Sequence, residues 1–207
     1  MIGYFKQYAE TLVIDGKGEE KAVLTRSSRS ASSNFKGNFV YNALLENQTQ
    51  LQNGDICKCK LNVNRRGVKE KTFLVVSVRH ADYSSQAVLY ECNGIATIYR
   101  PHEVYNDNDE VSSYTVEKIT ELPVNHMTIN DHMRLLNAGL LPSETKEFRM
   151  QKCGIKEMDR IMVRDMNGEY DESIFVVDAI DKTKFDGLLA VQTSIDNRPL
   201  GEIVNEV

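Results

Sequence analysis

The sequence has no apolar run near the roughly 18 residues that a membrane-spanning helix needs. Its first residues, Met1–Tyr8, also lack the basic cluster and long apolar stretch of a signal peptide. We therefore expect a protein that is made and used in a cytoplasm and has no membrane partner. Only four of its 207 residues are cysteines, and in a reducing compartment we expect free thiols. They are Cys57, Cys59, Cys92 and Cys153.

Sequence motifs of enzymes are also missing. There is no Walker loop, no Gly-x-Gly-x-x-Gly fingerprint, no Gly-x-Ser-x-Gly elbow and no His-Glu-x-x-His zinc motif. The four histidines are scattered along the chain, at His80, His102, His126 and His132. We therefore predict no catalytic residue, no cofactor and no enzymatic activity.

Two weak metal-site patterns favour a structural interpretation. Cys57 and Cys59 could supply two thiolates to zinc, with Cys92 or a histidine completing the site, but the usual Cys-x-x-Cys spacing is absent. Alternate residues of a strand point to one face, where cysteine packs as a small apolar side chain. The acidic segment 107–110 resembles the start of a calcium loop but lacks its glycine and distal glutamate. We predict buried thiols, a solvated acidic segment and no metal.

The chain is mildly acidic, with a formal net charge of −5. A protein whose main task is to grip nucleic acid needs clustered Lys and Arg to bind phosphates. The charge therefore argues against that class, although it permits a surface past which DNA slides.

One segment in the middle of the chain recurs near its end. Residues 73–92 align without a gap to residues 175–194, at a constant offset of 102 residues from Phe73 to Phe175 and from Cys92 to Ser194. Few residues are identical, but their types mostly agree. A repeat at the spacing of one small domain predicts two copies of one β-unit.

Short alternating segments separated by polar turns predict strands throughout. The turn signals Asn167-Gly168 and Asp186-Gly187 predict hairpins in the second half. A short helix is predicted over His132–Ala138, between the modules. At the N-terminus a helix ending at Gly16 and a strand over Thr11–Ile14 are both open.

The fold class is therefore mainly β, with two small barrel or sandwich-like modules related by the internal repeat and one short helix between them. We predict an N-terminal β module at 1–101, with a flexible Ser/Arg loop at 25–37. An acidic linker follows at 102–112, and a C-terminal β module covers 113–207.

The Ser/Arg loop is the most distinctive segment outside the predicted core. It is either a mobile surface loop or an arm that contacts a partner subunit or phosphates. In the second case aromatic residues beside the loop would anchor it. The candidate interface residues are Arg26, Arg29, Phe35, Lys36 and Phe39.

Three motifs follow one another in an order that resembles a known family. They are Gly54-Asp55, the strand Thr72–Val78 and the segment Ala87–Asn93. Together they resemble the head-closure, or stopper, proteins and related neck proteins of tailed bacteriophages. The similarity covers about Leu51–Tyr99. It departs from the family in Phe73, where Trp or Tyr is more usual, and in a longer and more basic segment before it.

This resemblance implies a structural virion protein. Such proteins form homo-oligomeric rings under the portal, close the channel after DNA packaging and give the tail a docking surface. Portal or adaptor proteins would lie above the ring and tail proteins below it, and the site of action would be the virion neck after assembly in the host cytoplasm. Ring assembly requires heterologous interfaces that close by rotation.

One concentrated basic patch is expected on a single hairpin. It would contact packaged double-stranded DNA in the lumen or an acidic neighbour, or it would only keep a β-edge soluble. Its residues are Lys58, Lys60, Arg65, Arg66, Lys69 and Lys71.

Two alternatives to the stopper function stay open. The first is a tail-completion or tail-associated ring protein, which shares the β-rich build. The second is a soluble β-barrel module that binds nucleic acid, in which case binding would depend steeply on salt.

Overall fold

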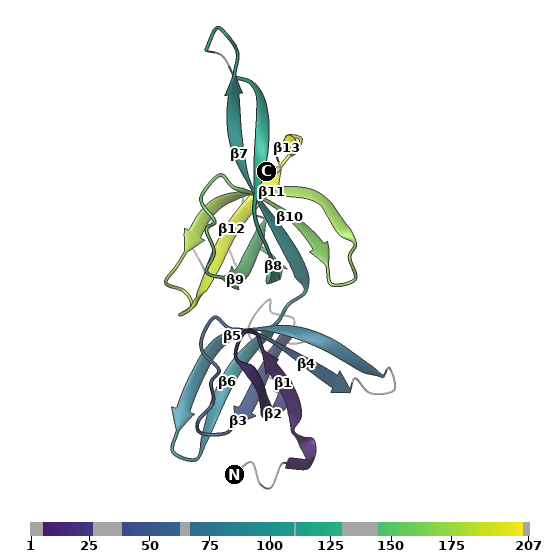
Figure 1. The fold of residues 1–207 in the computed structure, drawn as a ribbon, viewed down its shortest axis with the longest axis vertical. Helices are drawn as coiled ribbons and strands as arrows, with labels where there is room; N and C mark the ends of the chain where they lie inside the picture. Colours follow the sequence, from purple (N-terminus) through teal and green to yellow (C-terminus); the bar gives the residue numbers. More distant parts are fainter. Residues whose placement is uncertain (1–5, 27–38, 63–66, 110, 130–144, 205–207) are drawn as a thin grey trace. The chain divides into compact units, whose positions relative to one another are not determined.

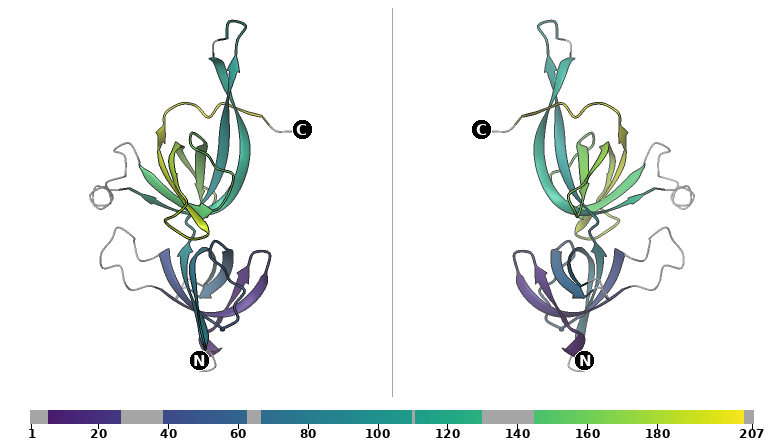
Figure 2. Two further views of the ribbon diagram at one scale, coloured as in Figure 1. Left: turned by 90° about the vertical axis from the view of Figure 1, so that its left-hand side faces the viewer. Right: turned by 90° about the vertical axis from the view of Figure 1, so that its right-hand side faces the viewer.

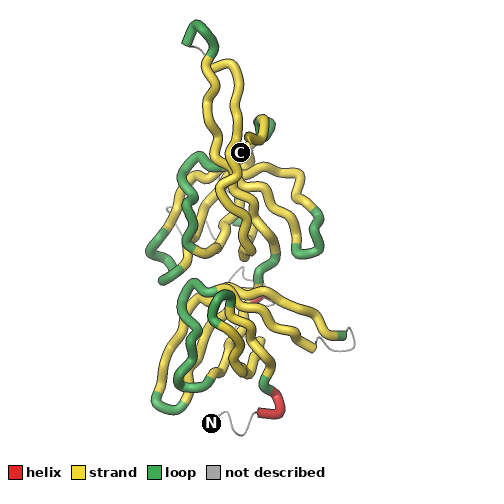
Figure 3. The backbone as a smooth tube through the Cα atoms, viewed as in Figure 1, coloured by secondary structure: helices red, strands yellow, loops and turns green. Residues whose placement is uncertain are grey.

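The computed structural model describes residues 6–26, 39–62, 67–109, 111–129 and 145–204, and the chain is almost entirely β within these ranges (Figures 1 and 3). A 3₁₀ turn, η2 (Lys6–Tyr8), precedes the first strand. The predicted helix over His132–Ala138 lies outside the described residues. The chain forms two compact units. Unit 1 contains Met1–Cys92, Met150–Lys152 and Lys182–Leu189, and unit 2 contains the rest.

Six strands of unit 1 close into a barrel, called barrel 1, in the order β1-β2-β3-β6-β5-β4. Antiparallel pairing of β1 with β4 closes it. The N-terminal segment therefore contributes a strand, which decides between the two structures predicted there. The strands are β1 (Glu10–Ile14), β2 (Gly18–Arg26), β3 (Val40–Leu45), β4 (Ile56–Asn62), β5 (Val68–Ala81) and β6 (Ser84–Glu91).

The next six strands form a second closed barrel, barrel 2, in which β8 pairs with both β7 and β9. A further short strand, β13 (Glu202–Val204), lies parallel to β8 outside the ring. The barrel strands are β7 (Gly94–Tyr105), β8 (Val111–Thr128), β9 (Lys146–Gln151), β10 (Arg160–Asp165), β11 (Tyr170–Asp181) and β12 (Leu188–Asp196).

The two barrels have the same strand topology. Adding six to each strand number of barrel 1 gives the order β7-β8-β9-β12-β11-β10, which is the order of barrel 2. The predicted fold class, two small β-barrel modules related by an internal repeat, is thereby confirmed. Closure removes the exposed strand edges on which open sheets aggregate.

The repeat is visible in the finer geometry of the hairpins β5–β6 and β11–β12. The register of β5 shifts between Val75 and Ser77, and that of β11 shifts between Val177 and Ala179, at the offset of 102 residues. The partner strands differ, because Val75 pairs with Leu89 whereas Val177 pairs with Thr193, two positions beyond the ungapped alignment. A shift of two residues keeps every side chain on its face, because the side-chain period of a strand is two.

The Gly54-Asp55 motif forms the turn that leads into β4, the entry turn of barrel 1. Gly54, at φ 90°, donates its N–H to Val75 O at 2.8 Å, and Val75 N donates to Asp55 O at 2.9 Å. The Asp55 carboxylate accepts the Gln52 N–H at 2.8 Å and an ion pair from Lys17 Nζ at 2.8 Å. The turn therefore fixes the start of one strand against the middle of its neighbour.

An entry turn of the same design leads into β10 in barrel 2. Met158, at φ 69°, donates to Val177 O at 2.9 Å, and Val177 N donates to Asp159 O at 2.9 Å. The Asp159 carboxylate accepts the Lys156 N–H at 2.8 Å and pairs with Arg100 Nη2 at 2.9 Å. The residues that suggested the family resemblance are thus duplicated structural elements.

Each barrel has its own aromatic core. In barrel 1 the rings of Tyr41 and Phe73 meet edge to face, with centroids 5.1 Å apart. In barrel 2 the rings of Phe148 and Phe175 do so at 5.7 Å. Such contacts add about 0.5–1.5 kcal/mol to the burial of the rings themselves.

The boundary between the units differs from the expected one. The first segment of unit 1 ends at Cys92, and residues 102–109, 111 and 112 belong to the hairpin of β7 and β8 rather than to a linker. Pairs such as Glu103 with Tyr114 and Val104 with Ser113 continue the ladder through this segment. The acidic and Asn-rich residues 106–109 lie at the end of that hairpin and are exposed. The prediction of a solvated segment is therefore confirmed for these residues, whereas the linker is not.

Candidate functional site

The four described residues of the predicted basic patch do not form one surface. Lys58 and Lys60 alternate with buried cysteines on β4 and are exposed. Across the hairpin they lie opposite Thr72 and Glu70. Arg65 and Arg66 lie outside the described residues.

Lys69 and Lys71 lie on the other face of the hairpin. Their cross-strand partners are Leu61 and Cys59, which belong to the barrel side. Lys71 Nζ forms an ion pair with Glu91 Oε2 at 2.7 Å. The pleat therefore separates the lysines, because neighbouring residues of a strand point in opposite directions.

The structure instead joins members of the two predicted sets at the Tyr41 hydroxyl. Arg26 Nε donates to Tyr41 Oη at 2.9 Å, and Lys71 Nζ donates to the same oxygen at 3.1 Å. The hydrogen bond to Tyr41, with the charge of Glu91 also nearby, raises the pKa of Arg26. This cluster joins the ends of β2, β3 and β5, so Arg26 and Lys71 have structural partners.

The other residues of the predicted arm are only partly described. Phe39 is half-buried and directly precedes β3. Arg29, Phe35 and Lys36 lie outside the described residues, so the arm stays a prediction.

The cysteine prediction is confirmed for the packing of the thiols. Cys57 and Cys59 point into the core cluster of barrel 1, and Cys92 is buried in a second cluster with Ile56 and Leu74. Burial raises the pKa of all three thiols, that of Cys59 to about 11. Within the described residues no group of three or more His, Cys, Asp or Glu side chains is placed to hold a metal ion.

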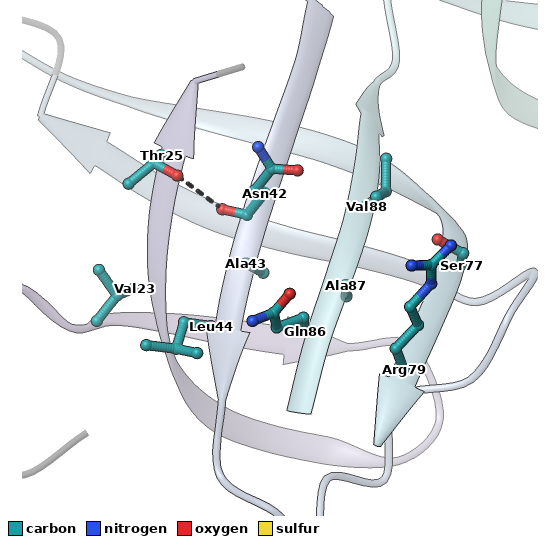
Figure 4. A pocket seen from close by; sticks show the side chains of 10 residues that line it. All are labelled: Val23, Thr25, Asn42, Ala43, Leu44, Ser77, Arg79, Gln86, Ala87 and Val88. Atoms are coloured by element: carbon teal, nitrogen blue, oxygen red, sulfur yellow. Dashed lines mark hydrogen bonds between the residues drawn. The ribbon is translucent and has the colours of Figure 1, made fainter. Parts of the chain in front are cut away.

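The strongest candidate site is a concavity of about 620 Å³ on the outer surface of barrel 1, the outer groove (Figure 4). Its side chains come from β2, β3, β6 and β5, which are neighbours in the barrel. The lining residues are Val23, Thr25, Asn42, Ala43, Leu44, Ser77, Arg79, Gln86, Ala87 and Val88.

Strand register arranges the outward side chains of the groove in two rows across the four strands. One row runs Thr25, Asn42, Val88 and Ser77, and the other runs Val23, Leu44, Gln86 and Arg79.

Val23, Leu44 and Val88 in these rows are half-buried and give the groove an apolar floor. Arg79 is exposed and is the one charged residue among the lining residues. The rows thus combine apolar surface, amide and hydroxyl groups, and a single cation at one side.

A second exposed feature belongs to unit 2. The hairpin β7–β8 extends beyond barrel 2, as the two views of Figure 2 show. β10 pairs with β7 only from Gly94 to Tyr99, whereas pairing with β8 continues to Tyr105. Because β13 pairs with β8 at Thr115–Glu117, only the end of the hairpin, from Glu103 and Tyr114 outward, is a two-stranded ribbon. Such ribbons are marginally stable alone in water.

One face of this ribbon, the hairpin face, carries Glu103, Tyr105 and Tyr114. Glu103 lies opposite Tyr114, and the Tyr105 hydroxyl donates to Glu103 Oε2, which raises the pKa of Tyr105. Tyr105 is 57% exposed and Tyr114 is 38% exposed. Large aromatic side chains at this exposure are typical of interaction surfaces.

Neither feature was found from the sequence alone. The outer groove depends on the pairing of β3 with both β2 and β6, which are far apart in sequence. For the hairpin a partial signal was present, because polar and apolar residues alternate through 113–116, after an Asn- and Asp-rich turn. The acidic composition of the turn concealed it.

Comparisons with known proteins give no family for this chain. No family model matches it, and no curated protein matches it. Among solved structures, the chain aligns with apo MrkH from K. pneumonia at a TM-score of 0.28 and 9% identity, over 94% of this chain and 81% of that one. A superposition at this level carries no argument about fold or function. No helix within the described residues is long and apolar enough to cross a membrane.

Proposed function

We propose that the protein is a structural subunit of a tailed-phage virion, a head–tail connector of the stopper type. It would assemble as a ring, close the portal channel after DNA packaging and present a docking surface to the tail. The observation that carries the proposal is the duplication of one closed barrel, together with the entry turn of Gly54 and Asp55 that resembles the family.

The physical arrangement suits assembly by shape, without covalent chemistry. A closed barrel with a fixed entry turn is a stiff body, and its ladder hydrogen bonds are satisfied internally. Contacts with neighbours then fall to the outer groove, the loops and the projecting hairpin. Portal or adaptor proteins on one side and tail proteins on the other are the partners that this function requires.

A second candidate function is a β-barrel module that binds nucleic acid. Exposed Lys58 and Lys60 on β4 favour it. If the protein forms a connector ring, the same lysines would bind packaged DNA only weakly, because the net charge of −5 opposes tight binding to phosphates.

The deciding measurement is the mass of the purified protein in solution, alone and mixed with portal or adaptor rings. We expect a discrete ring or co-migration with those rings. A monomer that does not bind the rings but changes in mobility when mixed with DNA would contradict the connector function and favour the nucleic-acid module. A ring that binds only isolated tail components would favour a tail-completion role.

A charge-reversed variant, Lys58→Glu with Lys60→Glu, separates the two functions further. If the protein is a nucleic-acid module, DNA binding should be lost and the dependence on salt should become shallower by about two phosphate contacts. If it is a connector, the variant should still co-migrate with the rings.

A further inference from the structure

We infer that the outer groove of one copy binds the hairpin face of a second copy, head to tail. The inference rests on the proposed function and deepens it, because it names the contact that would build the ring. Groove and hairpin are different surfaces of the same chain, so their contact is heterologous and propagates to a closed ring or a filament.

The dimensions of the two surfaces match. Four strands about 4.8 Å apart give the outer groove a width of roughly 14 Å, enough for a two-stranded ribbon with its side chains. The groove volume is about 620 Å³, and its apolar floor of Val23, Leu44 and Val88 offers burial to aromatic rings. Tyr105 and Tyr114 on the hairpin face are the exposed rings that would gain from it.

The charges of the two surfaces are complementary. Arg79 is the charged residue of the groove lining. The hairpin segment 102–109 carries Glu103, Asp107 and Asp109, all exposed, and contains no Lys or Arg. A partner of like charge would be repelled from this segment, whereas Arg79 would attract it and fix its position in the groove.

The ribbon itself also argues for a protein occupant. Beyond the pair of His102 with Thr115, where β13 also pairs with β8, the end of the hairpin lacks the third strand or packed layer that such ribbons need for stability. Seating in a groove of a second copy would supply that layer. The contact involves fewer residues than the roughly 20–30 a side of a standard interface, so the pairwise association should be weak and should need high protein concentration.

The test is the mass of the full chain over a wide concentration range, for the natural protein and two variants. Arg79→Glu alters the groove, and Glu103→Lys alters the hairpin face. We expect each change to weaken self-association at least 10-fold, while Lys60→Glu, an exposed cation on β4 outside the groove, leaves it unchanged. The chain carrying both changes should recover association, because the charge pair is restored in reverse.

Mixing the two single variants gives the sharpest readout. Each retains one intact surface, and between the two variants both the intact pair and the altered pair are complementary in charge. The mixture should therefore recover an assembly of alternating variants that neither variant forms alone. Unchanged assembly of Arg79→Glu, or a natural protein that stays monomeric at all concentrations, would overturn the inference. Co-migration of that monomer with portal or adaptor rings would leave the proposed function standing, whereas no binding to the rings would overturn both.

Discussion

Gly54 offers a direct test of the entry turn of barrel 1, through the substitution Gly54→Ala. Gly54 has φ +90°, a left-handed conformation that costs an L-residue about 1–2 kcal/mol. A Cβ added there would lie 2.4 Å from the carbonyl oxygen of Gly187, within the same unit. Two backbones must then separate, and overpacking of this kind costs about 1–3 kcal/mol more.

The expected loss is therefore about 3 kcal/mol in the free energy of unfolding. Gly16 provides the matched control, since it has φ +72° but nothing within 4 Å of an added Cβ. Gly16→Ala should cost only the conformational part, about 1–2 kcal/mol. Met158 holds the equivalent turn position in barrel 2 at φ 69°, so a positive φ alone is tolerated by this design.

Urea and thermal unfolding of the three proteins measure these differences. For a unit of this size each kcal/mol corresponds to a shift of about 4–8 °C in the melting temperature. Gly187→Ala should match Gly54→Ala, because its Cβ would meet the Asn53 carbonyl oxygen at 2.4 Å. Equal losses for Gly54→Ala and Gly16→Ala would refute the close approach on which the reasoning depends.

Three further predictions concern buried polar groups. Asp159→Ala should destabilise unit 2 by about 3 kcal/mol in urea unfolding, because the largely buried Arg100 pair and a turn hydrogen bond are lost; a loss below 1 kcal/mol would contradict this. Burial raises the pKa of Asp178 in the folded protein above its ordinary value of 3.8. The folded state therefore favours the protonated carboxyl, whose contribution to the free energy of unfolding is complete below pH 3.8 and is lost as the pH rises through the raised pKa. Asp178→Asn should therefore stabilise the protein at pH 7 and not at pH 3, in unfolding curves at both pH values. In native thiol labelling followed by mass spectrometry, half-buried Cys153 should react before the buried thiols. A labelling rate of Cys59 equal to that of Cys153 would contradict the burial of Cys59.

Local patterns in the sequence were sufficient for the strands and turns. Alternating segments predicted strands throughout, and the described residues are almost entirely β. Asn167-Gly168 and Asp186-Gly187 do form turns, with φ +97° and +82° at the two glycines. The alternation of Cys57 and Cys59 with lysines also predicted which side of β4 is buried. These features depend on neighbours one or two residues apart, where side-chain period and backbone sterics act directly.

The internal repeat shows that such patterns do not determine which residues pair across strands. The ungapped alignment places Leu89 on Val191, whereas the ladder makes Thr193 the equivalent of Leu89. Both alignments keep the same faces buried, because they differ by two residues and the strand period is two. The sequence pattern therefore identified two copies of one unit but did not indicate this two-residue shift in strand pairing.

Only the tertiary structure decided how the strands close and which surfaces result. The pairing of β1 with β4 and of β7 with β10 joins segments far apart in sequence, and no local pattern specifies such partners. The pairing of β3 with β2 and β6 likewise brings Lys71 to Arg26 at Tyr41 and builds the outer groove from four strands. The sequence by itself determined what each strand is made of and which face it buries, and the long-range hydrogen-bonded ladders determined what those faces meet.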